Sequence, residues 1–158
     1  MRKTIICILS SLVFLTACEK HQNILFDTPF VKITDSAGQS EMNIDKTMNG
    51  ILSELQVSIS VSANHFTQPI SIEYETIIGD GLTEGKDFKI QTNTKSPLTF
   101  DPGTYTLPVR ILWYKTDGFD PSKDNTLTIK LSSSSLDGMI LGFPGPDKKN
   151  STFKFIKK

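Results

Sequence analysis

The chain has 158 residues with 17 basic and 17 acidic side chains, and 37% of its residues are hydrophobic. This length suits one domain around a single core. The balanced charge provides no basic surface for nucleic acid or for anionic lipid. The two cysteines, Cys7 and Cys18, both lie near the N-terminus, so the rest of the chain has no disulfide, no thiolate nucleophile and no cysteine metal site.

Residues 1–17 have the pattern of a secretory signal. Arg2 and Lys3 supply positive charge, and an uncharged apolar run follows at residues 5–15. That run is roughly half of the ~20 residues that a membrane-spanning helix needs. Its length, its charged flank and the small residues after it are typical of a cleavable signal. We therefore predict that residues 1–17 are removed from the mature protein.

The end of this segment, Leu15-Thr16-Ala17-Cys18, resembles the lipobox of bacterial lipoproteins. In that motif a diacylglyceryl group is attached to the cysteine thiol, and cleavage occurs before the cysteine. The resemblance implies that Cys18 is the lipidated N-terminus of a cell-envelope protein that is anchored in the outer membrane. Two orientations remain as alternatives, with the domain on the periplasmic face or on the cell-surface face. Two or more acyl chains, at ~0.8 kcal/mol per buried CH₂, give stable anchoring. The alternative is an ordinary signal cleaved nearby, with Cys18 as a free thiol.

Residues 18–28 are polar and lack periodicity, and we predict a tether from membrane to domain. From residue 29 to residue 158 apolar residues recur with period two, which indicates strands. Seven strands are expected, at residues 30–33, 55–61, 70–74, 98–100, 105–113, 127–131 and 153–155. Residues 37–50 and 142–146 are expected to be loops, and Pro108 suggests an edge position or a bulge. The prediction is an all-β, immunoglobulin-like antiparallel β-sandwich of about seven strands.

From residue 72 onward the order of short motifs resembles the Calx-β-like sandwiches and related lipoproteins of Bacteroidetes. The matching motifs are Tyr74-Glu75-Thr76, Gly85-Lys86-Asp87-Phe88, Leu98-Thr99-Phe100-Asp101-Pro102-Gly103, Val109-Arg110-Ile111 and Leu127-Thr128-Ile129-Lys130-Leu131-Ser132. The resemblance implies the sandwich fold. Calcium-binding members look to acidic residues at three further places, where this chain has Leu112-Trp113-Tyr114, Lys123-Asp124-Asn125 and Phe155-Ile156-Lys157-Lys158. Because Ca²⁺ takes six to eight oxygen ligands and only Asp87 is retained, calcium binding does not carry over, and no cofactor is expected.

Several groups of polar residues are candidates for chemical sites. His21 and His65 have no partner that the sequence identifies. The aspartates of the 116–125 loop, Asp117, Asp120 and Asp124, suggest a solvated loop, with a weak cation site as the alternative. Four carboxylates between residues 80 and 101 could serve glycoside hydrolysis only if two of them faced one cleft ~5–10 Å apart. These four are Asp80, Glu84, Asp87 and Asp101.

Two positions remain as candidates for ligand contact or modification. Strand parity places Trp113 on the buried face and Tyr114 on the outer face, so Tyr114 is the candidate platform for a ligand. Asp35-Ser36-Ala37 resembles the acceptor sequence of Bacteroidetes O-glycosylation, which implies Ser36 as a candidate modification site.

The function expected from the sequence is a non-catalytic, membrane-anchored domain that binds a protein or glycan ligand at the cell envelope. One alternative is a carbohydrate-recognition accessory protein of a glycan-uptake system, which rests on the resemblance and on Tyr114. The other is a small envelope hydrolase that uses the carboxylates of residues 80–101.

Overall fold

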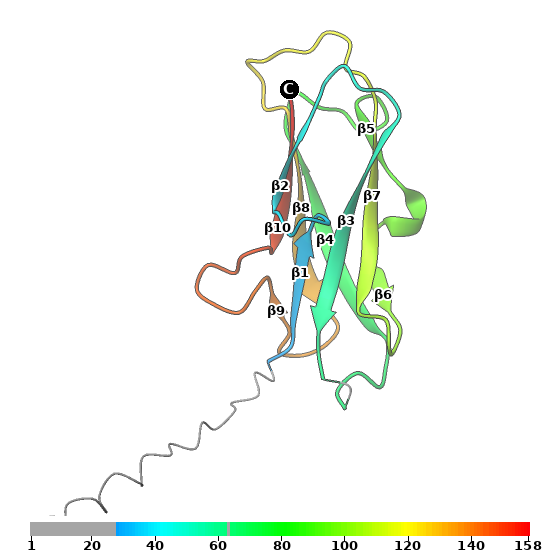
Figure 1. The fold of residues 1–158 in the computed structure, drawn as a ribbon, viewed down its shortest axis with the longest axis vertical. Coiled ribbons are helices and arrows are strands. Elements are labelled where there is room, and N and C mark those ends of the chain that lie inside the picture. The colour runs from blue at the N-terminus through cyan, green and yellow to red at the C-terminus, as the bar shows by residue number, and fades with distance from the viewer. Residues whose placement is uncertain (1–27, 63) are drawn as a thin grey trace, which may run out of the picture.

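The computed structural model describes residues 28–62 and 64–158. Two five-stranded sheets pack face to face in a β-sandwich (Figure 1). The first sheet has the order β5 (Phe88–Ile90), β7 (Thr106–Trp113), β3 (Ile51–Ser60), β1 (Phe30–Thr34) and β9 (Ile140–Leu141). The second has the order β2 (Glu41–Ile44), β10 (Thr152–Lys157), β8 (Thr126–Ser134), β4 (Ile70–Ile78) and β6 (Leu98–Phe100). The all-β sandwich predicted from the sequence is therefore confirmed.

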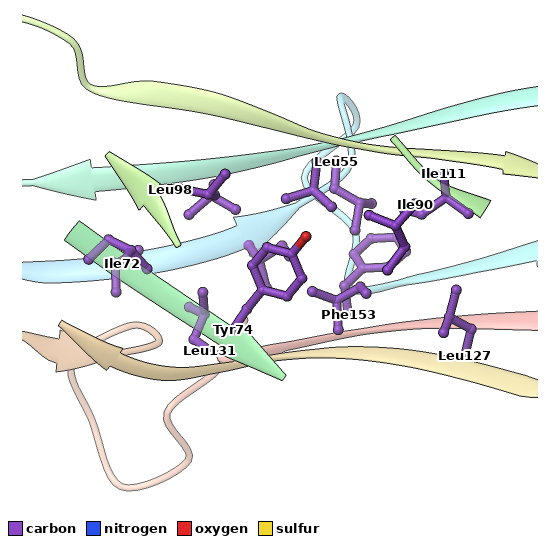
Figure 2. Packing of buried hydrophobic residues seen from close by; sticks show 14 of the residues in the cluster. Leu55, Ile72, Tyr74, Ile90, Leu98, Ile111, Leu127, Leu131 and Phe153 are labelled. Carbon is purple, nitrogen blue, oxygen red and sulfur yellow. The ribbon is translucent and has the colours of Figure 1, made fainter. Parts of the chain in front are cut away.

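The core lies between the sheets and follows the period-two pattern of the strands. In β3, Leu55, Val57 and Ile59 point inward, and the polar residues between them, Gln56 and Ser58, are partly exposed. The inward residues of both sheets meet in one cluster, with Leu55 and Ile111 facing Leu127 and Phe153 across the gap (Figure 2). Burial of this apolar surface is the main stabilising term available to the domain.

Aromatic side chains fill one end of the core. Trp113 is fully buried, as its parity predicted, and its ring centroid lies 5.6 Å from that of Phe88 and 5.2 Å from that of Phe155. Further along, the buried Tyr74 hydroxyl donates a 2.8 Å hydrogen bond to the Thr94 carbonyl in the 3₁₀ turn η2 (Thr92–Thr94). Burial raises the pKa of Tyr74 to about 12, because an ionised phenol would lose its water there.

Pro108 lies where the sequence suggested, beside an open strand edge. The backbone N–H of Arg110 donates to Thr94 and its carbonyl accepts from Gln91, so Arg110 bonds on the side away from β3. Hydrogen-bonding sides alternate along an antiparallel strand, so Pro108 faces that same side. The register of β5 with β7 runs only from residue 111 to residue 113, so the missing N–H of Pro108 removes no ladder bond.

The prediction of one loop over residues 37–50 was wrong, because β2 lies within it. Strand β2 pairs in parallel with β10, with Met42 opposite Phe155 and Ile44 opposite Lys157. Its partner is more than 100 residues away in the chain, and β2 contributes only two apolar side chains, so local periodicity does not reveal it. The short strands β5 and β9 are likewise additional to the seven expected strands, and all seven of those are present.

The predictions for the N-terminus lie outside the described residues. These are the signal at residues 1–17, lipidated Cys18, His21 and most of the tether at residues 18–28. Among the described residues, no helix has the length and apolar character required to cross a membrane.

Candidate functional site

A groove of about 760 Å³ lies between β2 and β3. Its long walls are runs of four consecutive residues, 42–44 of β2 with Asp45 directly after it, and 51–54 of β3. Consecutive residues point to opposite faces of a sheet, so a groove lined by four in a row faces the edges of both strands. The turn after β1 borders one end. The loop from β2 to β3, which arches over the top of the domain in Figure 1, borders the other.

In the described part of the chain, no strand pairs with the edge of β3 that borders this groove. Ile59 donates its backbone N–H to Tyr105, next to β7, so odd-numbered residues of β3 bond toward β7. Even-numbered residues therefore bond toward β1. The register of β1 with β3 ends at the pair Thr34–Gln56. Beyond it, the backbone N–H and C=O groups of Leu52 and Glu54 face the groove without a partner strand in the described chain.

The opposite wall is also a free edge. Lys154 and Lys158 donate their backbone N–H groups to the carbonyls of Ser40 and Ile44, so even-numbered residues of β2 bond toward β10. The backbone groups of Glu41 and Asn43 consequently point away from β10, toward the groove side. Two unpaired strand edges, one from each sheet, thus border one groove.

The groove is mostly apolar and its floor is fixed to the core. Met48, Ile51 and Leu52 are exposed by 46%, 42% and 53%, although all are large hydrophobic residues. At the floor, the Ser53 hydroxyl contacts the Met42 sulfur at 3.7 Å and accepts a 3.1 Å hydrogen bond from the Trp113 indole N–H. Exposed apolar side chains gathered around a hollow are characteristic of a binding surface.

The rim of the groove is predominantly acidic. The Asp35 carboxylate accepts backbone hydrogen bonds from the turn at residues 37–39, and Asp45 accepts from the Thr47 backbone N–H and hydroxyl. The Thr47 hydrogen bonds lower the pKa of Asp45, so this carboxylate stays ionised at neutral pH. Ser36, the candidate glycosylation site, is exposed in the same turn and also lines the groove.

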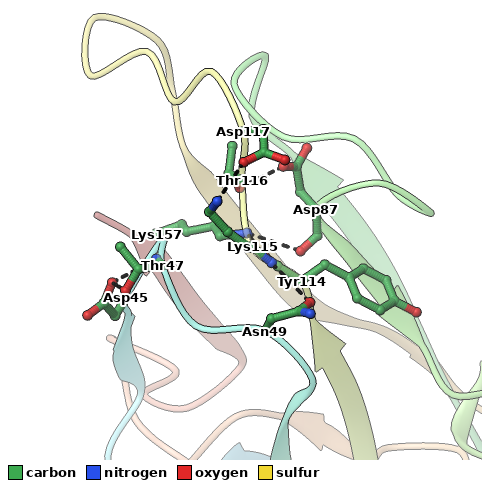
Figure 3. Close-up of polar contacts among 9 residues, drawn as sticks. All are labelled: Asp45, Thr47, Asn49, Asp87, Tyr114, Lys115, Thr116, Asp117 and Lys157. Atoms are coloured by element: carbon green, nitrogen blue, oxygen red, sulfur yellow. Dashed lines mark hydrogen bonds and ion pairs between the residues drawn. The ribbon is translucent and has the colours of Figure 1, made fainter.

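A second polar feature surrounds a buried lysine at the end of the sandwich where the last strand, β10, ends. Lys157 follows Phe153 and Phe155 in the inward-facing parity of β10, and only 1% of its surface is exposed. Its ammonium donates hydrogen bonds to the backbone carbonyls of Asp87, at 3.1 Å, and Tyr114 (Figure 3). Burial lowers the pKa of Lys157, and the nearby Asp87 carboxylate opposes that shift.

Asp87, which directly precedes β5, is the acidic residue of this cluster. Its carboxylate, 2% exposed, accepts a 2.6 Å hydrogen bond from the Thr116 hydroxyl and a 2.9 Å hydrogen bond from the Thr83 backbone N–H. Lys157 also donates its backbone N–H to the Asn125 carbonyl, so the chain segments around Asp87, Tyr114 and Asn125 meet at this lysine. In this chain a lysine ammonium, held by backbone carbonyls, therefore occupies the interior beside Asp87.

Tyr114 is only partly exposed, and its ring points away from the Lys157 cluster in Figure 3. Its backbone is fixed by Asp87 and Lys157, but the ring lies outside the groove between β2 and β3. His65 lies in the turn after β3, with its Nδ1 3.0 Å from the Ser62 hydroxyl. The structure brings neither side chain to the groove.

The four carboxylates considered for hydrolysis have separate structural contacts. Asp80 accepts a 2.8 Å backbone hydrogen bond from Asp124, and Glu84 forms an exposed 3.8 Å ion pair. Asp87 belongs to the buried cluster described above. Asp101 is exposed in the turn after β6, where its backbone carbonyl accepts from Thr104.

The loop aspartates also have separate contacts. Asp117 forms a 3.0 Å ion pair with Lys115, and Asp120 accepts hydrogen bonds from the Ser122 backbone N–H and hydroxyl. The Ser122 hydrogen bonds lower the pKa of Asp120. Within residues 28–62 and 64–158, no three His, Cys, Asp or Glu side chains gather in a way that could hold a metal ion.

Comparisons with known proteins inform the fold. No family model and no curated protein matches this chain. A crystal structure of Bacteroides thetaiotamicron EndoBT-3987 with Man5GlcNAc product is similar in structure, with a TM-score of 0.52 and 12% sequence identity. The similarity covers 79% of this chain and 30% of that chain, so this chain spans less than a third of its structural neighbour. At this identity the likeness concerns the fold alone.

Sequence reasoning missed both the groove and the buried lysine. One signal for the groove was available, because Leu52 shares the outward parity of Glu54, Gln56 and Ser58, where an apolar residue is out of pattern. The inward parity of Lys157 with Phe155 was a similar signal. The unpaired edges themselves could not be predicted, because they depend on where β1 leaves its sheet.

Proposed function

We propose that this protein is a lipid-anchored component of the bacterial cell envelope whose β-sandwich binds a ligand in the groove between β2 and β3 and catalyses no reaction. The groove is the observation that carries this proposal, because it combines exposed apolar side chains with unpaired backbone groups in one hollow. The anchor rests on the lipobox at residues 15–18 and places the domain close to a membrane surface.

The anchor is tested with Cys18→Ala in the native host. We expect the variant to leave the membrane fraction or to remain unprocessed, because no thiol is then available for acylation. Cys7→Ala is the matched control, since Cys7 lies inside the removed signal, and it should partition like the parent. A Cys18→Ala protein that is cleaved normally and still sediments with membranes would overturn the anchor.

The groove is tested with the full chain in detergent, screened against arrays of glycans and of short peptides. We expect ligands that bind the parent to lose at least tenfold in affinity with Leu52→Asp, because a charge would enter the apolar groove. Ile77→Asp is the matched control, since Ile77 is 50% exposed on β4, outside the groove. Ligands that bind Leu52→Asp as well as the parent would show that the groove is not the binding site.

Carbohydrate recognition is the second candidate, and the partly exposed ring of Tyr114 is the observation that favours it. Aromatic rings can stack against sugars, but a single ring gives little area. A glycan hit that is lost with Tyr114→Ala and kept with Leu52→Asp would support this candidate over the groove. The hydrolase alternative would require turnover of a glycoside that stops when Asp80 or Glu84 is replaced by its amide.

A further inference from the structure

The free edge of β3 favours an extended polypeptide over other ligands. The N–H and C=O groups of Leu52 and Glu54 point to the same side, about 6–7 Å apart along the strand. An extended peptide presents donors and acceptors with this repeat, as in recognition by strand addition. Sugars and acyl chains do not carry donors and acceptors in that pattern.

The apolar residues of the groove fit the side chains of such a strand. Ile51 shares the inward parity of Ser53, whereas Leu52 lies on the outer face, so apolar surface is available on both sides of the edge. Alternate side chains of an added strand would meet these two surfaces. The free part of β3 spans four residues, roughly 13 Å, which sets the length of the paired segment.

The edge also has little of the usual protection against pairing, because its one charged side chain, Glu54, is paired with Arg110. Proteins cover or interrupt exposed edges with proline, lysine, bulges or very short strands. At the opposite edge of the same sheet, Pro108 interrupts the part of β7 that β5 does not cover. Residues 51–54 contain neither proline nor lysine, and Leu52 remains 53% exposed.

The charges around the groove indicate which residues the bound peptide carries at its two ends. Asp35 and Asp45 lie on the rim, and their hydrogen bonds come from their own turns rather than from cations. Glu54 is paired with Arg110 at 2.7 Å, and Lys158 is the basic residue that lines the groove. The two aspartates therefore leave the rim net negative, which favours a basic partner.

We propose that the ligand of the groove is an extended segment of another envelope protein, with alternating apolar residues and basic flanks, which adds as a strand to the edge of β3 at Leu52 and Glu54. This inference rests on the proposed function of the groove. It goes beyond that function by naming the chemistry of the partner and the atoms that bind it.

The test uses the full chain in detergent and a synthetic heptapeptide of alternating valine and threonine with lysine at each end, together with a displayed library of seven-residue peptides. We expect the heptapeptide or a library hit to slow hydrogen exchange at the Leu52 and Glu54 amides at least tenfold. A copy of the bound peptide methylated at alternate backbone nitrogens, on the paired side, should lose at least tenfold in affinity.

Glu54→Pro is the decisive variant, because the Glu54 N–H faces the groove and not β7, so proline removes no bond of the existing sheet. Glu54→Ala is its matched control, since both variants lose the ion pair with Arg110. We expect Glu54→Pro to bind the peptide at least tenfold more weakly than Glu54→Ala, because the two variants differ in the backbone N–H and not in charge. Unchanged thermal unfolding of Glu54→Pro would confirm that the sheet is intact, and amide exchange in the parent tests the proposal without any variant.

The outcomes separate this inference from the proposed function. A ligand that depends on Leu52 but leaves the Leu52 and Glu54 amides unprotected would retain the groove as a binding site and overturn strand addition. Failure of every peptide to protect these amides would overturn it as well. A dimer that is lost with Glu54→Pro, without any peptide binding, would assign the edge to a second copy of the chain and overturn the proposed partner.

Discussion

The groove and the Lys157 cluster are two places where polar groups lie at the gap between the sheets. The polar groups are buried and hydrogen-bonded at the cluster, and they are open to solvent at the groove. At the cluster, the ammonium of Lys157 and the carboxylate of Asp87 are almost fully buried, and each has two hydrogen-bond partners. At the groove, backbone groups of β3 and β2 face a hollow, and Leu52 is more exposed than buried. Closing an internal gap requires a partner for each polar group, and within residues 28–62 and 64–158 no strand pairs with the backbone groups that face the groove.

This difference indicates where function and stability reside. A buried, satisfied polar cluster fixes how the sheets meet, because loss of one partner leaves another group unpaired in low dielectric. An open edge contributes little to folding and leaves backbone groups available to a ligand. Variants at the two places should therefore separate stability from binding.

The largest expected effect contrasts two leucines three residues apart on β3. Leu55 is fully buried and Leu52 is 53% exposed. We expect Leu55→Ala to lower the free energy of unfolding by about 3 kcal/mol, through lost burial and a cavity, and Leu52→Ala to change it by less than about 0.5 kcal/mol. Urea unfolding of both variants gives the two values. Equal losses would mean that Leu52 is a core residue and that the groove is closed in solution.

An intermediate effect is expected at the cluster. Asp87→Ala leaves the Thr116 hydroxyl and the Thr83 N–H without their acceptor and removes the negative charge that acts on Lys157. We expect a loss of about 2 kcal/mol, measured by urea unfolding. Asp101→Ala, in an exposed turn, is the control and should stay within about 0.5 kcal/mol. If Asp87→Ala leaves the free energy of unfolding unchanged, the cluster does not have the structural role assigned to it.

The smallest expected effect is a change in how stability varies with pH. Burial lowers the pKa of Lys157 in the fold below its ordinary value of 10.5. At a pH between the pKa of the folded state and 10.5, the unfolded chain binds a proton that the folded chain has released. The free energy of unfolding should therefore rise with pH in that window. Lys157→Met should remove this rise, and Lys158→Met, at an exposed position, should keep it.

The measurement is the slope of unfolding free energy from pH 7 to pH 9.5 for the three proteins. Higher pH is avoided because an unfolded tyrosine ionises near pH 10, whereas the pKa of Tyr74 in the fold is about 12, so stability falls there for a separate reason. Identical slopes for the parent and Lys157→Met would show that Lys157 is not desolvated in solution.

The fold was predictable from the sequence where side-chain alternation reports burial. The alternation of Leu55, Val57 and Ile59 located β3, and the parity of Trp113 placed it correctly in the core. The β2 strand was missed because its hydrogen bonds come from β10, at the far end of the chain. Of the candidate residues, Ser36 lines the groove, whereas Tyr114 lies outside it.

By itself the sequence determined the all-β class, the inward face of each long strand and, through its lipobox, the expectation of an anchor at Cys18. These follow from local patterns, namely a period of two and a short motif. The tertiary structure alone decided that β1 ends at Thr34 while β3 continues to Ile51, and that Lys157 reaches the carbonyls of Asp87 and Tyr114. Free edges and buried ions depend on which distant segments become neighbours, and local periodicity carries no record of that pairing.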